Sequence, residues 1–206
     1  MYVEKFLAHI ADNSPTFKCY ACGDKQESLN LTAQLAHTRN SPATGDELKQ
    51  LRDWLTSHAE DFVVLYSQHN GLIIYEDTAG DAAGIMLYPV ANWPDKTEEM
   101  KSQFEAMGVE QDDQPAGVID SLAFGEIPHS ANYFTVKLSG PHAGKIFYAD
   151  HDDFSDDPFA DSFADFLARV VNDPTKFLYD VGCYTRYSDG KTSTQWIPKE
   201  YGNSSA

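Results

Sequence analysis

The stretch LAFGEIPHSANYFTVKLSGPHAGKIFYADHDD, residues 122–153, decides the fold of this chain. From residue 133 to residue 139, bulky apolar side chains alternate with more polar ones, a period typical of a strand with one buried face. Residues 140–144 hold two glycines and a proline and predict a turn, after which residues 145–149 return as a second strand. We therefore expect an antiparallel hairpin that forms the middle of a sheet.

An acidic run, Asp-His-Asp-Asp at residues 150–153, follows the second strand. Unpaired charges are unfavourable inside a sheet, so the strand is expected to end here in a solvated acidic edge. The same run, with Asp156 and Asp157, could instead ligate a divalent cation and serve a hydrolase that uses His151. Against this, the spacing is not that of a calcium loop, and consecutive strand residues point to opposite faces, so few of these side chains should converge.

The composition indicates one folded domain with a strong negative charge. The chain has 206 residues, of which 42% are hydrophobic and 13% aromatic, with a net charge of -17. This field disfavours non-specific binding to nucleic acid or to an anionic membrane and favours a basic partner. Acidity that only keeps the protein in solution is the alternative explanation.

The first ten residues carry Glu4 and Lys5 within their apolar pattern, unlike a signal peptide, and no apolar run reaches the ~20 residues that span a bilayer. We therefore expect a cytoplasmic protein. Its three cysteines give no disulfide framework.

Hydrophobic periodicity and turn residues predict the remaining elements. Thr44 and Glu47 have capping-box spacing, and Gly71 is expected to end a helix in the left-handed conformation. Helices are predicted near residues 1–12, 44–55, 59–69, 95–107 and 159–172, and strands near 16–20, 29–35, 72–75, 85–90, 181–187 and 191–197. We expect the last two strands to form a hairpin beside the N-terminal strands, making a second small sheet from the two ends of the chain.

A C-x-x-C pair followed by glycine, Cys19 and Cys22, resembles half of a zinc knuckle. Cys183 and either His37 or His9 would have to complete the site from distant positions. Two reduced thiols in a turn are the simpler interpretation, and we expect no cofactor.

Four stretches together resemble the SUKH superfamily, the Smi/Knr-like domain of fungal cell-wall regulators and bacterial immunity proteins. The first is FGEIPHSANYF followed by GKIFYADHDD, the second is EDFVVLYSQHNGLIIY, the third is a Trp just after the strand at 85–90, and the fourth is ADSFADFLARV. The resemblance implies seven fold-defining positions: Asn70, Gly71, Trp93, Gly125, Asn132, Gly144 and Phe163.

The same resemblance implies an α+β fold, a mainly antiparallel mixed sheet flanked by helices, at residues 44–173. Residues 1–43 would add a helix and strands, and residues 174–206 a hairpin that packs on this core. It also implies a protein-binding domain without catalytic activity, most simply an immunity protein that neutralises a cognate basic, nuclease-like toxin. A regulatory scaffold without a toxin is the alternative, and the hydrolase comes third. The predicted partner-binding residues are Asp150, His151, Asp152, Asp153, Asp156 and Asp157.

Overall fold

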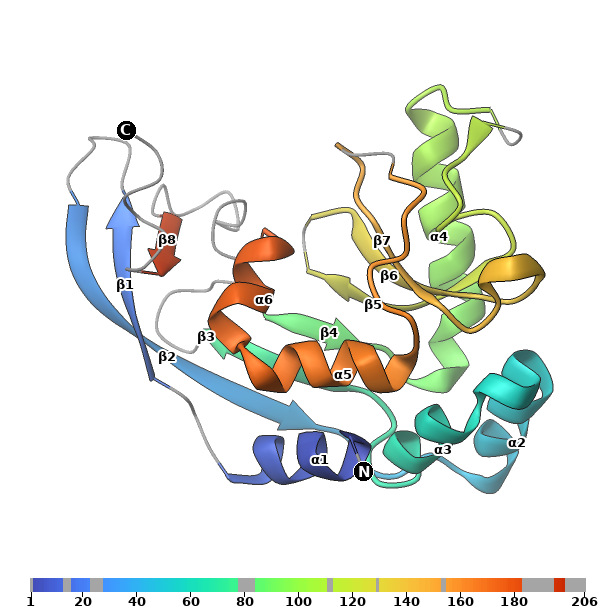
Figure 1. The fold of residues 1–206 in the computed structure, drawn as a ribbon, viewed down its shortest axis with the longest axis horizontal. Helices are drawn as coiled ribbons and strands as arrows, with labels where there is room; N and C mark the ends of the chain where they lie inside the picture. The colour runs from blue at the N-terminus through green and yellow to red at the C-terminus, as the bar shows by residue number, and fades with distance from the viewer. Residues whose placement is uncertain are drawn as a thin grey trace.

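A computed structural model of the chain describes residues 2–12, 16–22, 28–77, 84–110, 113–128, 130–152, 155–182 and 195–198. Its strands form one sheet in the order β7-β6-β5-β4-β3-β2-β1-β8, and each pairing between neighbouring described strands is antiparallel (Figure 1). The strands are β1 (Thr16–Cys22), β2 (Ser28–Arg39), β3 (Leu72–Asp77), β4 (Ile85–Leu87), β5 (Ser121–Ile127), β6 (Asn132–Lys137), β7 (Ile146–Ala149) and β8 (Gln195–Pro198). The predicted α+β class is confirmed.

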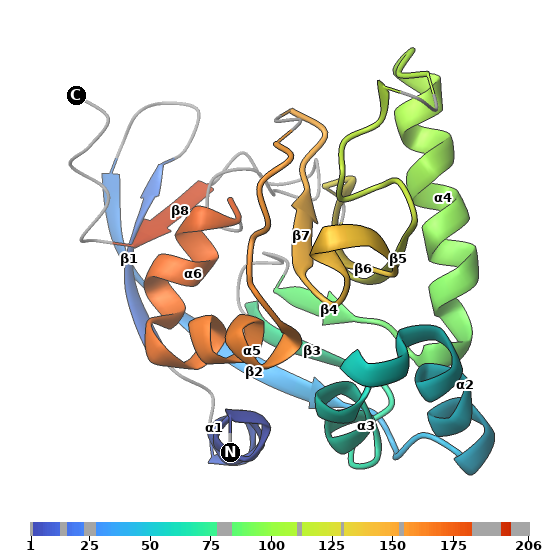
Figure 2. The same cartoon turned by 45° about the vertical axis from the view of Figure 1, so that its right-hand side comes forward.

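The helices are α1 (Tyr2–Asp12), α2 (Gly45–Leu55), α3 (Glu60–Tyr66), α4 (Trp93–Ala106), α5 (Phe163–Asn172) and α6 (Pro174–Asp180). They cover both faces of the sheet, with α4 and α5 on opposite sides (Figure 2). Adjacent side chains of β6 show this division, since Tyr133 donates to Glu99 of α4 while the ring of Phe134 packs 5.0 Å from that of Phe166 in α5.

The predicted hairpin is confirmed as β6 and β7, joined by a turn in which Gly140 and Gly144 have φ of +77° and +80°. Its predicted place was wrong: the hairpin lies at one edge of the sheet rather than in the middle. On the outer edge of β7, the backbones of Ile146 and Ala160 exchange two hydrogen bonds, of 2.9 and 3.0 Å. This short bridge covers part of an edge that would otherwise expose unpaired donors and acceptors.

The expectation of a single buried face was also wrong, because residues 132–136 of β6 are all buried. On the face away from α5, Thr135 donates to the Gly117 carbonyl at 2.6 Å, which brings the turn at 115–119 onto the strand. Polar residues of the alternating pattern are therefore satisfied by hydrogen bonds inside the protein rather than by water.

Aromatic rings fill the space between the sheet and α3 and α5. Phe124 of β5 lies 5.6 Å from Phe163 and from Phe166, both edge to face, and Phe163 stacks on Phe62 of α3 at 3.7 Å. These four side chains are at most 2% exposed. This cluster is the main core of the domain, and its apolar burial is the dominant stabilising contribution.

The predicted capping box of α2 is confirmed: Thr44 accepts from the Glu47 amide at 3.3 Å, and the Glu47 carboxylate accepts from the Thr44 amide at 2.7 Å. The role assigned to Gly71 was wrong. Helix α3 ends at Tyr66, so Gly71 lies beyond its C-cap. Its predicted left-handed conformation is confirmed, with φ of +86°. Glycine is also needed here because a Cβ would stand 2.8 Å from the Leu87 carbonyl oxygen.

The two ends of the chain meet as predicted, since β8 pairs with β1. They do not form a second sheet: β2 pairs with both β1 and β3, so the terminal strands continue the main sheet. Of the predicted strand at 181–187, only residues 181 and 182 are described, and they form a turn after α6.

Several boundaries differ from prediction. The strand at 85–90 ends at Leu87, and Trp93 begins α4 rather than preceding it. Phe159 lies before α5, which begins after the N-cap Ser162. Strand β5 and helix α6 were not predicted as separate elements.

Candidate partner-binding surface

The acidic run after β7 is partly buried, contrary to the expected solvated edge. The Asp150 side chain is 10% exposed, whereas that of Asp152 is 60% exposed. Asp150 accepts from the Asp152 amide at 3.0 Å, so the chain turns here instead of remaining extended. The turn explains why these residues do not alternate between faces as predicted.

A hydrogen-bond network holds this turn against the sheet. Asn132, which is fully buried, accepts from the His151 amide at 3.2 Å and contacts His151 Nδ1 at 2.6 Å through its Oδ1. Its Nδ2 donates to the Tyr148 hydroxyl, which donates in turn to the Val181 carbonyl. Because Asn132 Oδ1 is an acceptor here, the facing Nδ1 of His151 carries the hydrogen.

The turn also brings three potential metal ligands together. One ligand atom from each of Asp150, His151 and Asp152 lies within 4.8 Å of the others. The prediction that few of these side chains would converge was therefore wrong. However, Asp150 and His151 already serve the turn and the Asn132 network, which explains their geometry without an ion.

The other predicted acidic residues are placed differently. Asp156 accepts from the Ala116 amide at 2.8 Å and so ties the segment after the turn to the segment before β5. The Asp157 amide donates to the Ser155 hydroxyl at 3.2 Å, and Asp157 is exposed. Asp153 lies outside the described residues.

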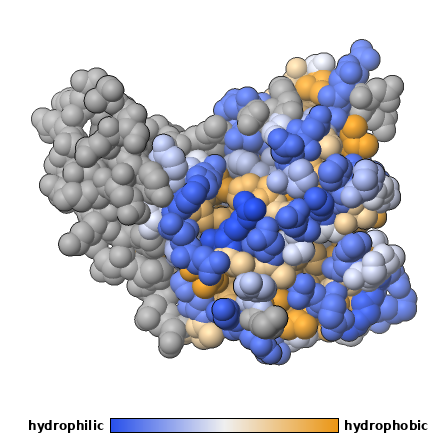
Figure 3. Space-filling model, in the orientation of Figure 1, coloured by the Kyte–Doolittle hydropathy of each residue, from blue (hydrophilic) through white to orange (hydrophobic). Residues whose placement is uncertain are grey.

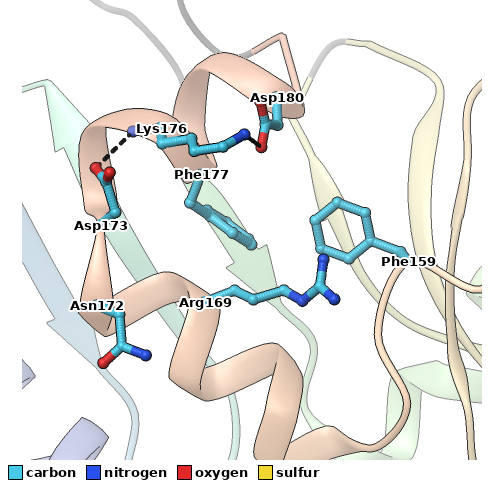
Figure 4. Close-up of a pocket in the computed structure, with 7 residues that line it drawn as sticks. All are labelled: Phe159, Arg169, Asn172, Asp173, Lys176, Phe177 and Asp180. Atoms are coloured by element: carbon cyan, nitrogen blue, oxygen red, sulfur yellow. Dashed lines mark hydrogen bonds and ion pairs between the residues drawn. The ribbon is translucent and has the colours of Figure 1, made fainter.

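Next to this turn, two adjoining hollows lie between α6 and residues 155–159, with volumes of about 250 and 330 Å³. We call them together the α6 groove. Phe159 and Arg169 line both hollows, and Figure 4 shows the Arg169 guanidinium beside the Phe159 ring, 5.5 Å from its centroid. Figure 3 shows hydrophobic surface within a hydrophilic surround on this face of the molecule.

The α6 groove is acidic overall. Four aspartates line it, against one arginine and one lysine: Asp150, Asp157, Asp173, Asp180, Arg169 and Lys176. Both cations contact carboxylates, Arg169 that of Asp165 at 3.3 Å and Lys176 that of Asp180. Sequence reasoning missed this groove, because Phe159 was predicted to begin a helix and Asp180 carried no local signal.

A family model, the SMI1 / KNR4 family (SUKH-1), matches residues 42–169, which is more than half of the chain. The chain belongs to this family. No curated protein matches it. Domains of the family are generally non-catalytic, act in toxin immunity or in Smi1-like regulation, and bind protein partners such as toxins. Among the described residues, no helix is long and apolar enough to cross a membrane.

The residues expected to define the SUKH fold occupy tight positions inside the matched segment. Asn70 joins the loop before β3 to two other segments, since it accepts from the Val90 amide at 2.9 Å and donates to Glu47 of α2 at 2.8 Å. A Cβ on Gly125 would lie 2.7 Å from the Met86 carbonyl oxygen, and one on Gly144 would meet the His58 ring at 2.3 Å.

Trp93, also expected to define the fold, is fully buried at the start of α4. Its Nε1 donates to the Tyr88 carbonyl at 3.2 Å, and its ring stacks on Trp54 of α2 at 6.0 Å. It therefore packs α4 against α2, in a structural role that an indole with a satisfied N–H can fill.

The zinc alternative relied on a turn that the structure does not show. Cys19 and Cys22 both lie in β1, where a three-residue separation spans ~10 Å of extended backbone. His37 lies in β2, and its Nδ1 accepts from the Tyr75 amide at 3.3 Å. Cys183 lies outside the described residues.

His37 belongs to a polar cluster that sequence reasoning did not predict. The Tyr75 hydroxyl contacts His9 Nε2 of α1 at 2.6 Å and donates to the Val170 carbonyl of α5 at 2.9 Å. That carbonyl has no helical donor because the residue four positions later is Pro174. Burial lowers the pKa of His37 to about 4, with contributions from His9 and Arg39, and burial also lowers the pKa of His9.

Proposed function

We propose that this SUKH domain is an immunity protein that binds and blocks a basic toxin through the surface formed by the β7 turn and the α6 groove. The observation that carries the proposal is the gathering of carboxylates around an apolar hollow in a chain of net charge -17. Opposite fields accelerate association and disfavour wrong partners.

The arrangement suits binding more than chemistry. The Asn132 network fixes His151 and Asp150, which supplies a rigid base for the exposed carboxylates of Asp152 and Asp157. A surface that is already ordered loses less conformational entropy when a partner binds. The family's general use of protein partners supports the same interpretation.

The direct test uses the gene next to that of this chain. Where that gene encodes a secreted protein with a toxin-like C-terminal domain, expression of this domain should arrest growth, and co-expression of the full chain should restore it. With the purified proteins, calorimetry should show a complex whose affinity falls at least about tenfold as the salt concentration rises.

A charge-matched pair of triple variants locates the surface. Replacement of Asp152, Asp156 and Asp157 by asparagine should weaken the complex and its salt dependence. The control variant carries Asp46→Asn, Glu60→Gln and Glu105→Gln, at exposed positions of α2, α3 and α4. It should retain the affinity of the natural chain. Equal losses in both variants would contradict a localised acidic surface. Growth arrest that the chain does not relieve would contradict the immunity function.

A further inference from the structure

The α6 groove combines apolar walls with an acidic rim. Phe177 at its base is 3% exposed, and Phe159 and Tyr148 are partly buried along its sides. We propose that the α6 groove is the seat of one arginine side chain of the protein partner. This inference rests on the proposed function, because it names the side chain by which a basic partner is recognised.

The size of the groove limits its occupant. Ligand pockets for whole small molecules begin at about 300 Å³. Each of the two hollows by itself, at about 250 and 330 Å³, is near that lower limit, so the group bound in one hollow is expected to be small. A single long side chain fits such a space, whereas a helix or strand does not enter it. The main chain of the partner would therefore remain outside, above the rim.

The charges of the groove favour a cation at one end. Arg169 and Lys176 contact Asp165 and Asp180, and both cations line the hollow next to Phe177. The other hollow is lined by Asp150 and Asp157, and Arg169 is the one basic side chain in its lining. A partner's cation is therefore expected at the Asp157 end, where it meets carboxylates and stays away from Lys176.

The aromatic walls favour arginine over lysine. A guanidinium is planar and weakly hydrated, so it stacks on an aromatic face more readily than an ammonium group. The chain itself provides an example, since the Arg169 guanidinium lies over the Phe159 ring. The rings of Tyr148 and Phe159 contact each other, with centroids 6.0 Å apart. A second guanidinium would therefore lie against these rings from the hollow that they line, next to Asp157.

The test uses the full chain and the blocked peptide acetyl-Gly-Arg-Gly-amide, with chemical-shift changes of backbone amides measured by NMR. The arginine peptide should give saturable shifts confined to residues 148–159 and 176–182. The matching citrulline peptide has the same shape without the charge, and it should give none. Lysine should bind more weakly than arginine.

Two variants test the walls and the rim separately. Phe159→Leu keeps an apolar side chain but removes the ring, and should weaken arginine binding about twofold to fivefold. Asp157→Asn changes an exposed residue, so folding is preserved, and should weaken it by a similar factor. Asp46→Asn in α2 is the matched control and should bind the arginine peptide as the natural chain does.

The inference is overturned if citrulline binds as well as arginine, if lysine binds as tightly, or if the shifts spread evenly over acidic residues. It is also overturned if no shifts occur. The outcome is separable from that of the proposed function. A toxin complex that ignores Phe159→Leu and Asp157→Asn would retain the immunity function and reject the groove. Arginine binding without any toxin complex would support the groove as an arginine site and reject the immunity function.

Discussion

Two clusters hold helices against the same sheet, one by apolar packing and the other mainly by hydrogen bonds. Near β5, the rings of Phe124, Phe163 and Phe166 pack α5 against the sheet without polar atoms. Near β3, the rings of His9, His37 and Tyr75 lie 5.0–5.9 Å apart and hold α1 and the end of α5 by hydrogen bonds. The first cluster lies within the family match and the second is built largely by residues before it.

The comparison shows how a helix that lies outside the family match is held against the sheet. Val3, Phe6 and Ile10 of α1 bury apolar surface, but the contact with the sheet also depends on imidazoles. Apolar packing is insensitive to pH, whereas buried imidazoles become unfavourable when protonated. We therefore expect the two regions to respond differently to mutation and to acid.

The largest effect is expected for Phe163→Ala, which leaves a cavity between Phe62 and Phe124. The free energy of unfolding should fall by about 3–5 kcal/mol, as measured by denaturant titration. The size of this loss should be similar at neutral and mildly acidic pH, because no titratable group is removed. A loss of stability smaller than that caused by Tyr75→Phe would contradict the assignment of this cluster as the main core.

A smaller loss, about 1–3 kcal/mol, is expected for Tyr75→Phe. The ring remains, but His9 loses its contact and the Val170 carbonyl loses the donor that replaces the amide absent from Pro174. Hydrogen exchange should increase at the end of α5 and in α1 more than in β5–β7. Uniform acceleration across the sheet would show that the hydroxyl has no local role.

The smallest effect is a pH dependence that His37 contributes. Its pKa is about 4 in the folded chain, below the ordinary value, so the unfolded chain binds the proton more readily. Stability is therefore complete above the ordinary pKa of ~6.5 and declines as pH falls towards 4. These two pKa values correspond to a loss of about 2 kcal/mol between neutral pH and pH ~5. His37 is only partly buried, and solvent screening is expected to reduce this loss to about 1 kcal/mol.

The control for this prediction is His37→Asn, which retains an acceptor for the Tyr75 amide and does not titrate. Its stability should decline less steeply with acid than that of the natural chain, and the two curves should run parallel above neutral pH. Identical slopes throughout would show that His37 does not couple protonation to folding.

Sequence reasoning succeeded where the signal lies within a few residues. The hairpin followed from period-two alternation and two glycines, and the start of α2 followed from Thr44 and Glu47. It failed where a distant neighbour decides the outcome. Gly71 is required by the Leu87 carbonyl rather than by a helix end, and Asp150 is buried by a turn that Asn132 supports from another strand.

The sequence by itself determined the antiparallel hairpin, the capped start of α2, the family and the acidic character of the chain, because these depend on local spacing, turn chemistry and composition. Only the tertiary structure decided that the hairpin is an edge, that β8 extends the sheet through β1, and that Phe159, Arg169 and Asp180 form one groove. Strand order and convergent side chains depend on contacts between residues far apart in the chain, which no local pattern specifies.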